Sequence, residues 1–474
     1  MNDSIVPICV DLDGSLTPID TLHESLVDVC RRFPGTLLRL PFWILKGKAY
    51  FKQAVAARTH VDFATLPIRA DLLEWLQAER ANGRRLVLVT AANRKIADGV
   101  ASHVGIFDEV LASSESVNLG GEQKRRALAE RFGEKGFDYV GNAQADVAVW
   151  KSAHRAIVVG GNGLAAKAGR VTEVARVFPV SLPRLKVWLK AIRLPQWVKN
   201  VLVFLPALLS HEFTNPAVLT ASVLAFFAFS TCASSVYLIN DLFDLASDRR
   251  HPRKSKRPFA SGALSARSGL IVAVLLFGVS ILIAVKISVW FCVVLASYYI
   301  ITWAYTVRLK RHAIVDVLTL AGLYDMRIIA GAVATMIRPS FWLLAFAIFI
   351  FLSLGIVKRY AELYDARLAG KARAHGRGYS GDDLGLLLSL GTASGYCAVM
   401  VMAFYINSPD AQVLYKHIEP LWLICPLMLY WISRMWLLAS RGQMDEDPVV
   451  FAIRDRISIA AFCLIGLIVF LSSV

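Results

Sequence analysis

The distribution of apolar residues divides the chain near residue 193. Before this point, short apolar runs such as residues 5–10 and 86–89 are separated by mixed polar segments, which is typical of buried strands in a soluble α/β domain. After it, apolar runs of about 20 residues recur, the length that a helix needs to cross a bilayer. The pattern predicts an N-terminal α/β domain followed by an all-α membrane bundle.

We expect about nine transmembrane helices in the second part of the chain. Each follows one apolar run, and short polar connections separate them. The expected spans cover residues 199–213, 217–239, 268–285, 288–305, 314–335, 340–357, 384–406, 418–439 and 453–472.

Positive charge gathers in alternate connections between these spans. The chain has 52 Lys and Arg residues against 36 Asp and Glu, a net charge of +16. Arg and Lys are frequent in residues 240–267, 306–313 and 358–383 and nearly absent from the connections between them. Because basic loops stay in the cytoplasm, we expect a multi-pass protein of the bacterial inner membrane with a cytoplasmic N-terminal domain. Topology thus explains the charge, and nucleic acid is not expected as a partner.

The seven cysteines are scattered, with no CxxC pair. This spacing favours reduced, packed thiols over a disulfide framework or a zinc site.

An acidic cluster follows the second apolar run. Asn240, Asp241, Asp244 and Asp248 recur at helical spacing, so we expect them on one helix face. Oxygen ligands in this number suit Mg²⁺, which shares its coordination shell with substrate phosphates. The alternative is an ordinary cytoplasmic helix end, but carboxylates at membrane depth are costly and usually functional.

A basic cluster follows the acidic one and ends at Arg257. Its side chains are of the kind that bind phosphates directly. The alternative is that the cluster only sets the topology of the loop. The cluster comprises Arg249, Arg250, Arg253, Lys254, Lys256 and Arg257.

The stretch NDLFDLASDRRHPRKSKRP, from residue 240, resembles the first aspartate-rich motif of the UbiA superfamily of intramembrane prenyltransferases. The resemblance covers about residues 185–474 and implies a helical bundle. It implies that the four acidic-cluster residues bind the donor diphosphate through Mg²⁺, and that Arg257 contacts phosphate.

The loop after the sixth span departs from the usual family pattern. Aromatic prenyltransferases of the superfamily carry a second motif, DxxxD, there, whereas no aspartate follows Asp365 at that distance. Three phrases instead resemble the decaprenyl-phosphate phosphoribosyltransferases: VKRYAEL, YDMRIIAGAVAT and RLPQWVKNVLVFLPAL. That branch uses phosphoribosyl diphosphate as donor and a polyprenyl phosphate as acceptor.

The resemblance to this branch implies a set of headgroup contacts. Lys199 and Lys310 are equally consistent with interfacial side chains that snorkel. Arg327 lies in an apolar span, where an unpaired cation is expensive, and Asp325 is a candidate partner. The implied contacts are Lys199, Asn200, Lys310, Arg327, Lys358, Arg359 and Glu362.

The N-terminal part carries four short motifs in order. Asp11 and Asp13 follow an apolar run, and Gly14 permits a sharp bend after them. A second predicted strand ends at Thr90, Lys124 follows in a helical segment, and a third predicted strand precedes Asn142 and Asp146.

This order resembles the haloacid dehalogenase (HAD) superfamily of phosphatases. The resemblance implies that Asp11 attacks phosphorus, that Asp13 acts as acid and base, and that Thr90 and Lys124 hold the phosphoryl oxygens. It also implies Mg²⁺ bound by Asp11, the Asp13 carbonyl, Asn142 and Asp146. Asn142 stands where the family usually has aspartate, so a non-catalytic domain remains an alternative.

The predicted organisation has three parts. Residues 1–160 form the HAD-like domain with a helical cap at about 18–70, residues 161–194 a linker and interfacial segment, and residues 195–474 the UbiA-like domain. Within the cap, the basic and aromatic stretch 36–57 either lies on the membrane surface or packs as a cap helix.

The combined resemblances predict a bifunctional enzyme. The bundle would transfer 5-phosphoribose to a polyprenyl phosphate, and the HAD-like domain would remove the 5-phosphate from the product. One alternative is an aromatic prenyltransferase with an accessory phosphatase domain. Another is a transporter whose aspartates bind a cation. The sequence leaves open whether the chain forms homo-oligomers.

Overall fold

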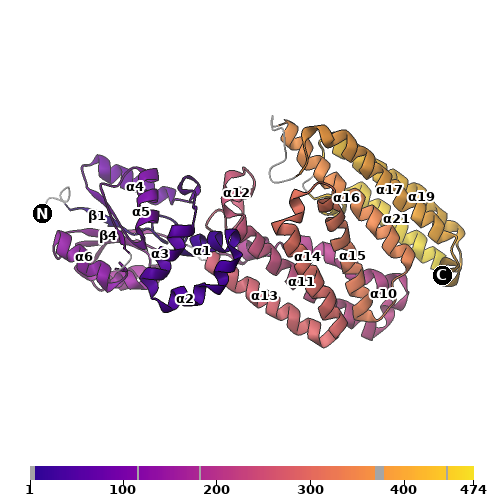
Figure 1. Ribbon diagram of the computed structural model, residues 1–474, viewed down its shortest axis with the longest axis horizontal. Coiled ribbons are helices and arrows are strands. Elements are labelled where there is room, and N and C mark those ends of the chain that lie inside the picture. The colour runs from indigo at the N-terminus through magenta and orange to yellow at the C-terminus, as the bar shows by residue number, and fades with distance from the viewer. Residues whose placement is uncertain (1–5, 115–116, 181–182, 369–377, 445–446, 474) are drawn as a thin grey trace. The chain divides into compact units, whose positions relative to one another are not determined.

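The computed structural model describes residues 6–114, 117–180, 183–368, 378–444 and 447–473. The chain forms two compact units. Unit 1 comprises residues 1–192 and 237–273, and unit 2 comprises residues 193–236 and 274–474. The long helices α11 (Pro216–Phe243) and α13 (Ala266–Ile287) therefore each belong to both units. Figure 1 shows the strands in the N-terminal part of the chain and helices in the rest.

A parallel sheet forms the centre of unit 1. Its strand order is β3-β2-β1-β4-β5-β6, and every neighbouring pair is parallel. The last strand extends the sheet into the stretch 161–194, where the sequence predicted a linker. The strands are β1 (Ile8–Val10), β2 (Leu86–Asn93), β3 (Glu109–Ser113), β4 (Asp138–Gly141), β5 (Arg155–Val159) and β6 (Glu173–Phe178).

Helices cover both faces of this sheet because successive strand residues point to opposite sides. Ile8 and Val10 pack with residues of α4 (Ala70–Ala81) and α5 (Arg94–Val104) on one face. Cys9, Val87 and Val89 pack on the other face. The helices there are α6 (Glu122–Phe132), α7 (Val147–Ser152) and α8 (Asn162–Gly169).

Three helices between β1 and β2 form the cap. They are α1 (Thr21–Arg32), α2 (Leu40–Leu45) and α3 (Lys48–Arg58), and they have a small core of their own around Trp43 and Val55. Asp20 caps α1, because its carboxylate accepts hydrogen bonds from the backbone N–H groups of Leu22 and His23. The unit also contains α9 (Leu185–Ala191) and α12 (Leu245–Arg250).

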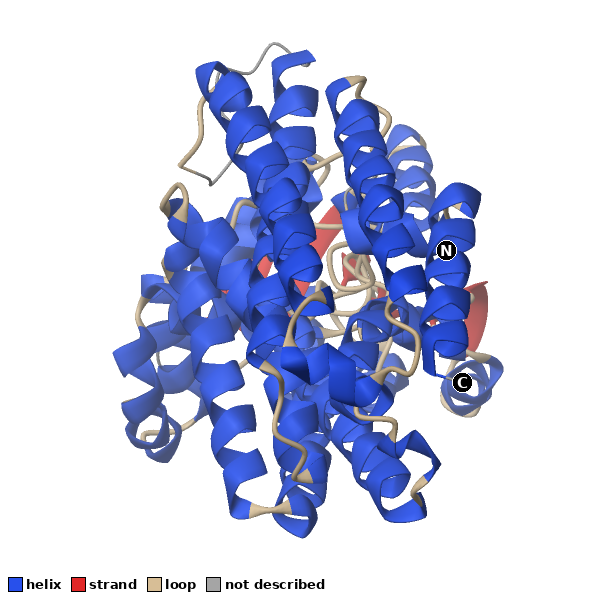
Figure 2. Ribbon diagram, turned by 90° about the vertical axis from the view of Figure 1, so that its right-hand side faces the viewer, coloured by secondary structure: helices blue, strands red, loops and turns tan. Residues whose placement is uncertain are grey.

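Unit 2 is built from helices, and no strand lies among its described residues. Helices make up most of the described chain, as the blue ribbons of Figure 2 show. Besides its parts of α11 and α13, it contains η5 (Leu194–Phe204), α10 (Leu205–Leu209), α14 (Val289–Val307), α15 (Val315–Thr335), α16 (Phe341–Leu368), α17 (Leu384–Ile406), α18 (Pro409–Leu414), α19 (Ile424–Ser440), α20 (Pro448–Arg454) and α21 (Arg456–Ser473).

Eight helices in the described parts of the chain are long and apolar enough to cross a membrane. They match eight of the nine expected spans, so the protein is a multi-pass membrane protein. The expected span 199–213 is not among them. The apolar helix in that stretch covers Leu194–Leu209 and is shorter than the other eight, and Ser210 and the left-handed His211 follow it. The expected loop 358–383 begins too early, because α16 continues to Leu368, and residues 369–377 of that loop lie outside the described residues.

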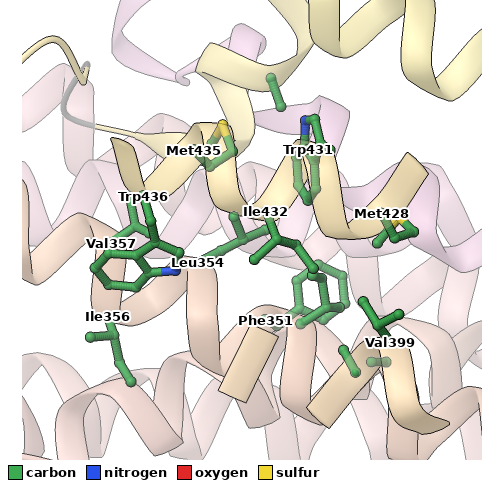
Figure 3. Close-up of a cluster of buried hydrophobic side chains, with 14 of the residues drawn as sticks. Phe351, Leu354, Ile356, Val357, Val399, Met428, Trp431, Ile432, Met435 and Trp436 are labelled. Atoms are coloured by element: carbon green, nitrogen blue, oxygen red, sulfur yellow. The ribbon is translucent and has the colours of Figure 1, made fainter. Parts of the chain in front are cut away.

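The core of unit 2 is formed by α16, α17 and α19. Ile432 of α19 points toward Phe351 and Leu354 of α16, and the ring of Trp436 lies beside Val357 (Figure 3). The indole of Trp436 donates to Ser353 Oγ at 3.1 Å, and that hydroxyl donates to the carbonyl of Gly391 at 2.7 Å. The helices approach so closely there that a Cβ atom at Gly391 would lie 2.0 Å from the Trp436 ring.

Substitution of Gly391 tests this packing. Gly391→Ala should destabilise the bundle by about 1–3 kcal/mol, because the added methyl group overpacks the contact with Trp436. Gly385→Ala on the same helix is the control, since nothing lies within 4 Å of a Cβ there. The measurement is thermal unfolding of the purified variants in one detergent. Equal melting temperatures for the two variants would contradict the described helix contact.

Candidate functional site

The first site lies at the carboxyl ends of three neighbouring strands of unit 1. Asp11 follows β1, Thr90 lies in β2, and Asn142 follows β4. Because β1 pairs in parallel with both β2 and β4, these ends meet at one edge of the sheet, where α/β proteins bind ligands.

A buried hydrogen-bonded network connects the charged groups of this site. Lys124 Nζ of α6 lies 2.6 Å from Asp11 Oδ1 and 2.9 Å from the Tyr139 hydroxyl. That hydroxyl donates to Asp146 Oδ1 at 2.9 Å. Tyr139 was missed by the sequence analysis, and its signal is its place in β4, two residues before the glycine at the strand end.

Asp13 is held apart from this network by the cap. Its Oδ1 accepts the backbone N–H of Thr21, at the start of α1, at 2.8 Å. Burial, with repulsion from Asp20, raises the pKa of Asp13 to about 7. A carboxyl with that pKa exchanges a proton near neutral pH, as a general acid and base must.

Asn142 packs tightly against the turn that follows Asp11. Gly14 has a φ of +78°, and a Cβ there would lie 2.0 Å from Asn142 Nδ2. Asn142 Oδ1 accepts a hydrogen bond from Ser15 Oγ at 3.2 Å. The amide therefore lies beside the turn that follows Asp11.

The electrostatics at this site favour a cation. Burial raises the pKa of Asp11 to about 6; Lys124 opposes this rise and the charge of Asp146 adds to it. No three His, Cys, Asp or Glu side chains among the described residues are close enough to hold a metal ion as they stand. The Asp11 and Asp146 carboxylates nevertheless repel each other, which an ion bound between them would relieve.

The acidic cluster forms a second site at the end of α11. The helix breaks at Asp244, and α12 then carries Asp248. Arg257 Nη1 lies 3.2 Å from Asp241 Oδ1 and 2.7 Å from Asp248 Oδ2, so one guanidinium brings the two carboxylates together. Arg257, implied as a phosphate contact, thus binds the cluster itself.

Asn240 supplies a further oxygen in this cluster. Its Oδ1 is buried and has no hydrogen-bond partner among the described atoms. Buried polar atoms are normally satisfied, so an orphaned oxygen beside two carboxylates fits a site for a bound cation. Burial also raises the pKa of Asp248, although Arg257 opposes the rise.

Two residues of the basic cluster bind the cap within unit 1. The guanidinium of Arg249 forms a two-point ion pair with Glu24 of α1, at 2.6 and 2.8 Å, with the side chains only 7% and 8% exposed. Arg250 pairs with Asp62 at 2.6 Å. Arg249 therefore holds the cap helix α1, and Arg250 holds the segment that follows α3.

Arg327 is the centre of a third group, which lies in unit 2. It donates to Asn200 Oδ1 at 2.8 Å and to the Tyr298 hydroxyl at 3.3 Å. Asn200 in turn donates to Ser230 Oγ at 2.9 Å. Asp325, the expected partner of Arg327, takes no part, because residues two apart point to different sides of a helix.

The guanidinium of Arg359 is hydrogen-bonded to groups within the bundle. It donates to Asp316 at 2.5 Å, to Glu362 at 2.5 Å and to the Tyr305 hydroxyl at 2.7 Å. Tyr379 also donates to Asp316 at 2.7 Å. Arg359 therefore ties together α14, α15 and α16, and its partner Asp316 was missed by the sequence analysis.

Two lysines of unit 2 converge on one carboxylate. Lys199 of η5 forms an ion pair with Asp447, and Lys358 Nζ of α16 lies 3.9 Å from the same Oδ2. Asp447 caps α20 through Oδ1. Burial acts against ionisation of Asp447, but Lys199 and Lys358 lower its pKa overall. Lys310 lies apart from this pair in sequence, in the short η8 (Leu309–Arg311).

Comparison with known families accounts for both parts of the chain. Residues 201–457 match the UbiA prenyltransferase family. The chain belongs to that family. Residues 8–176 match the haloacid dehalogenase-like hydrolases, so this UbiA-family member has an N-terminal HAD-like domain.

Three relatives illustrate the similarity of this UbiA-family chain. The protein y4nM of Sinorhizobium fredii is 36% identical over 96% of this chain and 89% of its own length. A decaprenyl-phosphate phosphoribosyltransferase of Mycobacterium tuberculosis is 39% identical over 56% of this chain and 88% of its own. A UbiA homologue of Archaeoglobus fulgidus, solved with GPP and Mg²⁺, is 18% identical, with a TM-score of 0.46 over 60% of this chain and 99% of that one.

The Glu24–Arg249 pair can be tested by a double-mutant cycle. Glu24→Gln should destabilise unit 1 by about 3–5 kcal/mol, because it leaves the Arg249 cation buried without its charge partner. The double variant Glu24→Met/Arg249→Met should recover most of that loss, since no buried charge remains. Thermal unfolding in detergent measures both effects.

The control for this cycle is the exposed Arg94–Asp98 pair, with side chains 61% and 48% exposed. Asp98→Asn should cost at most about 1 kcal/mol, because solvent screens the pair. A Glu24→Gln variant that melts like Asp98→Asn would contradict the buried ion pair.

Proposed function

We propose that this protein is a bifunctional membrane enzyme. Its UbiA-family part transfers the 5-phosphoribosyl group from phosphoribosyl diphosphate to a polyprenyl phosphate such as decaprenyl phosphate. Its HAD-like domain then removes the 5-phosphate and leaves a polyprenyl-phosphoryl ribose. The protein lies in the bacterial inner membrane with the HAD-like domain in the cytoplasm, as the distribution of basic residues favours.

The observation that carries this proposal is the pair Lys199 and Lys358 around one carboxylate. An enzyme that binds a prenyl diphosphate through two metal motifs needs further aspartates after α16. The sequence has none between Asp365 and Asp382, and α16 presents lysine instead. A carboxylate held by two lysines marks a position suited to an anionic phosphate. The relatives named decaprenyl-phosphate phosphoribosyltransferase favour the same chemistry.

The transfer step needs no general base, because the acceptor phosphate is already an anion. One of its oxygens bonds to the anomeric carbon of ribose, and the bond from that carbon to the diphosphate breaks. Bound Mg²⁺ would neutralise charge on the leaving diphosphate. Asn240, Asp241, Asp244 and Asp248 are the residues we assign to hold it. Lys199 and Lys358 are assigned to phosphate binding.

The five other implied headgroup contacts are assigned three different roles. Arg327 and Asn200 form one buried network and are assigned to hold the polar end of a substrate together. Arg359 and Glu362 are assigned a positioning role, because Arg359 is bound to three groups of the bundle. Lys310 remains a candidate phosphate contact.

The hydrolytic step uses the first site. Asp11 attacks phosphorus and forms an aspartyl phosphate while Asp13 gives its proton to the departing 5-oxygen of ribose. A water molecule then gives a proton back to Asp13 and attacks the same phosphorus, which frees phosphate and Asp11. Lys124 and Thr90 hold the phosphoryl oxygens. Asp11, the Asp13 carbonyl, Asn142 and Asp146 are assigned to hold Mg²⁺, which would neutralise the transferred group.

Donor binding separates this proposal from an aromatic prenyltransferase. In detergent with Mg²⁺, phosphoribosyl diphosphate should bind and geranyl diphosphate should not. Lys358→Met should weaken donor or acceptor-phosphate binding about 10–100-fold, because it removes a charged contact. Lys286→Met, at an exposed lysine, is the matched control. Calorimetric titration measures each affinity, and tight geranyl diphosphate binding would favour the aromatic prenyltransferase.

Two aspartate variants separate the two reactions. Asp11→Asn removes the attacking carboxylate with little change in shape, so polyprenyl-phosphoryl 5-phosphoribose should accumulate while transfer continues. Asp241→Asn should suppress both lipid products and leave hydrolysis of a soluble phosphomonoester intact. Mass spectrometry of lipids formed from phosphoribosyl diphosphate and a defined polyprenyl phosphate measures the products. Dephosphorylated lipid from Asp11→Asn would refute the hydrolytic assignment, and normal transfer by Asp241→Asn would refute the metal assignment.

A further inference from the structure

The cap of unit 1 exposes an unusual number of large apolar side chains. Leu38 and Leu45 are 79% and 83% exposed, in a domain whose other helices bury their apolar faces against the sheet. We name this set the cap patch, and it consists of Phe33, Leu37, Leu38, Phe42, Ile44, Leu45 and Tyr50.

The cap patch is held in place from below. Trp43 of α2 is buried with Val29 of α1 and Val55 of α3, and its ring stacks against the Arg58 guanidinium at 4.8 Å. Trp43 therefore anchors α2 in the core of the cap, while its neighbours Phe42, Ile44 and Leu45 are exposed. Such an apolar surface marks a site of interaction with a partner or a membrane.

The charge around the cap patch has one sign. Residues 29–61 contain no Asp or Glu. They contain seven Lys or Arg residues: Arg31, Arg32, Arg39, Lys46, Lys48, Lys52 and Arg58. Apolar side chains flanked by basic ones suit the headgroup region of a bilayer that carries anionic lipids.

We propose that the cap patch is a membrane-surface site, which inserts its apolar side chains into an anionic bilayer. Eight of the described helices are long and apolar enough to cross a membrane, so unit 1 is tethered near a lipid surface. A second copy of the chain is a poor occupant, because it would bring an equally basic surface into contact. This site does not depend on the reactions proposed above.

The same cap connects the patch to the first site. Lys52 of α3 reaches the end of β2, where its Nζ donates to the carbonyl of Ala91 at 2.6 Å and to Asn118 Oδ1 at 2.7 Å. The helix α3 therefore contributes both Tyr50 to the cap patch and Lys52 to the end of β2.

Hydrogen exchange of the full-length chain in nanodiscs tests the proposal. Backbone amides of residues 37–48 should exchange at least about tenfold more slowly in phosphatidylglycerol-containing nanodiscs than in phosphatidylcholine alone, because basic residues are attracted to anionic lipid. Leu38→Glu/Leu45→Glu should abolish that difference. Val177→Glu, at an exposed apolar position of β6, should preserve it.

A second variant controls for misfolding of the Leu38→Glu/Leu45→Glu variant. Arg39→Gln/Lys46→Gln/Lys48→Gln keeps every apolar side chain and should lose only the dependence on anionic lipid. Melting temperatures in detergent establish that all variants are folded. Protection that is the same in both lipids and in all variants would overturn the proposal. Protection that grows with protein concentration and ignores lipid charge would assign the surface to a second copy and overturn it too.

Discussion

The structure depends on the cost of burying charge. An ion taken out of water must find an opposite charge or a set of hydrogen bonds, or the chain loses several kcal/mol of stability. Each buried ion of the candidate sites has such a partner: Lys124 with Asp11, Arg257 with Asp241 and Asp248, and Asp447 with Lys199 and Lys358. The same ion pairs therefore stabilise the fold and gather the charged side chains of the candidate sites.

Within unit 1, the helix α1 contacts Asp13 of the first site and Arg249, which follows the acidic cluster. Its first backbone N–H holds the Asp13 carboxylate, and one turn later Glu24 holds Arg249, the neighbour of Asp248. The cap is therefore bonded both to the phosphatase-type site and to the segment that carries the acidic cluster. A lipid-bound cap patch would add the membrane surface as a third attachment of the same helices.

Ion pairs in the bundle are of two kinds. Arg359, 2% exposed, and Asp316, fully buried, join α14, α15 and α16, and all the guanidinium nitrogens of Arg359 are engaged. Lys199 and Lys358 share one carboxylate across η5 and α16, which leaves their ammonium groups suited to a second anion. Arg359 and Lys358 are neighbours in one motif, yet the first has three partners within the bundle and the second shares a carboxylate with Lys199.

Local spacing along the chain was enough to predict several features. Apolar runs predicted the strands that end near Asp11, Thr90 and Asn142 and eight of the nine spans, and the spacing of polar residues predicted the acidic cluster at Asn240. The partners of the charged residues depend on the tertiary structure. Tyr139, Asp316 and Asp447 acquire their roles from residues brought together by packing, and Arg249 pairs with Glu24 across 225 positions of sequence. Such ion pairs form between elements that are far apart in the chain, so no local period in the sequence predicts them.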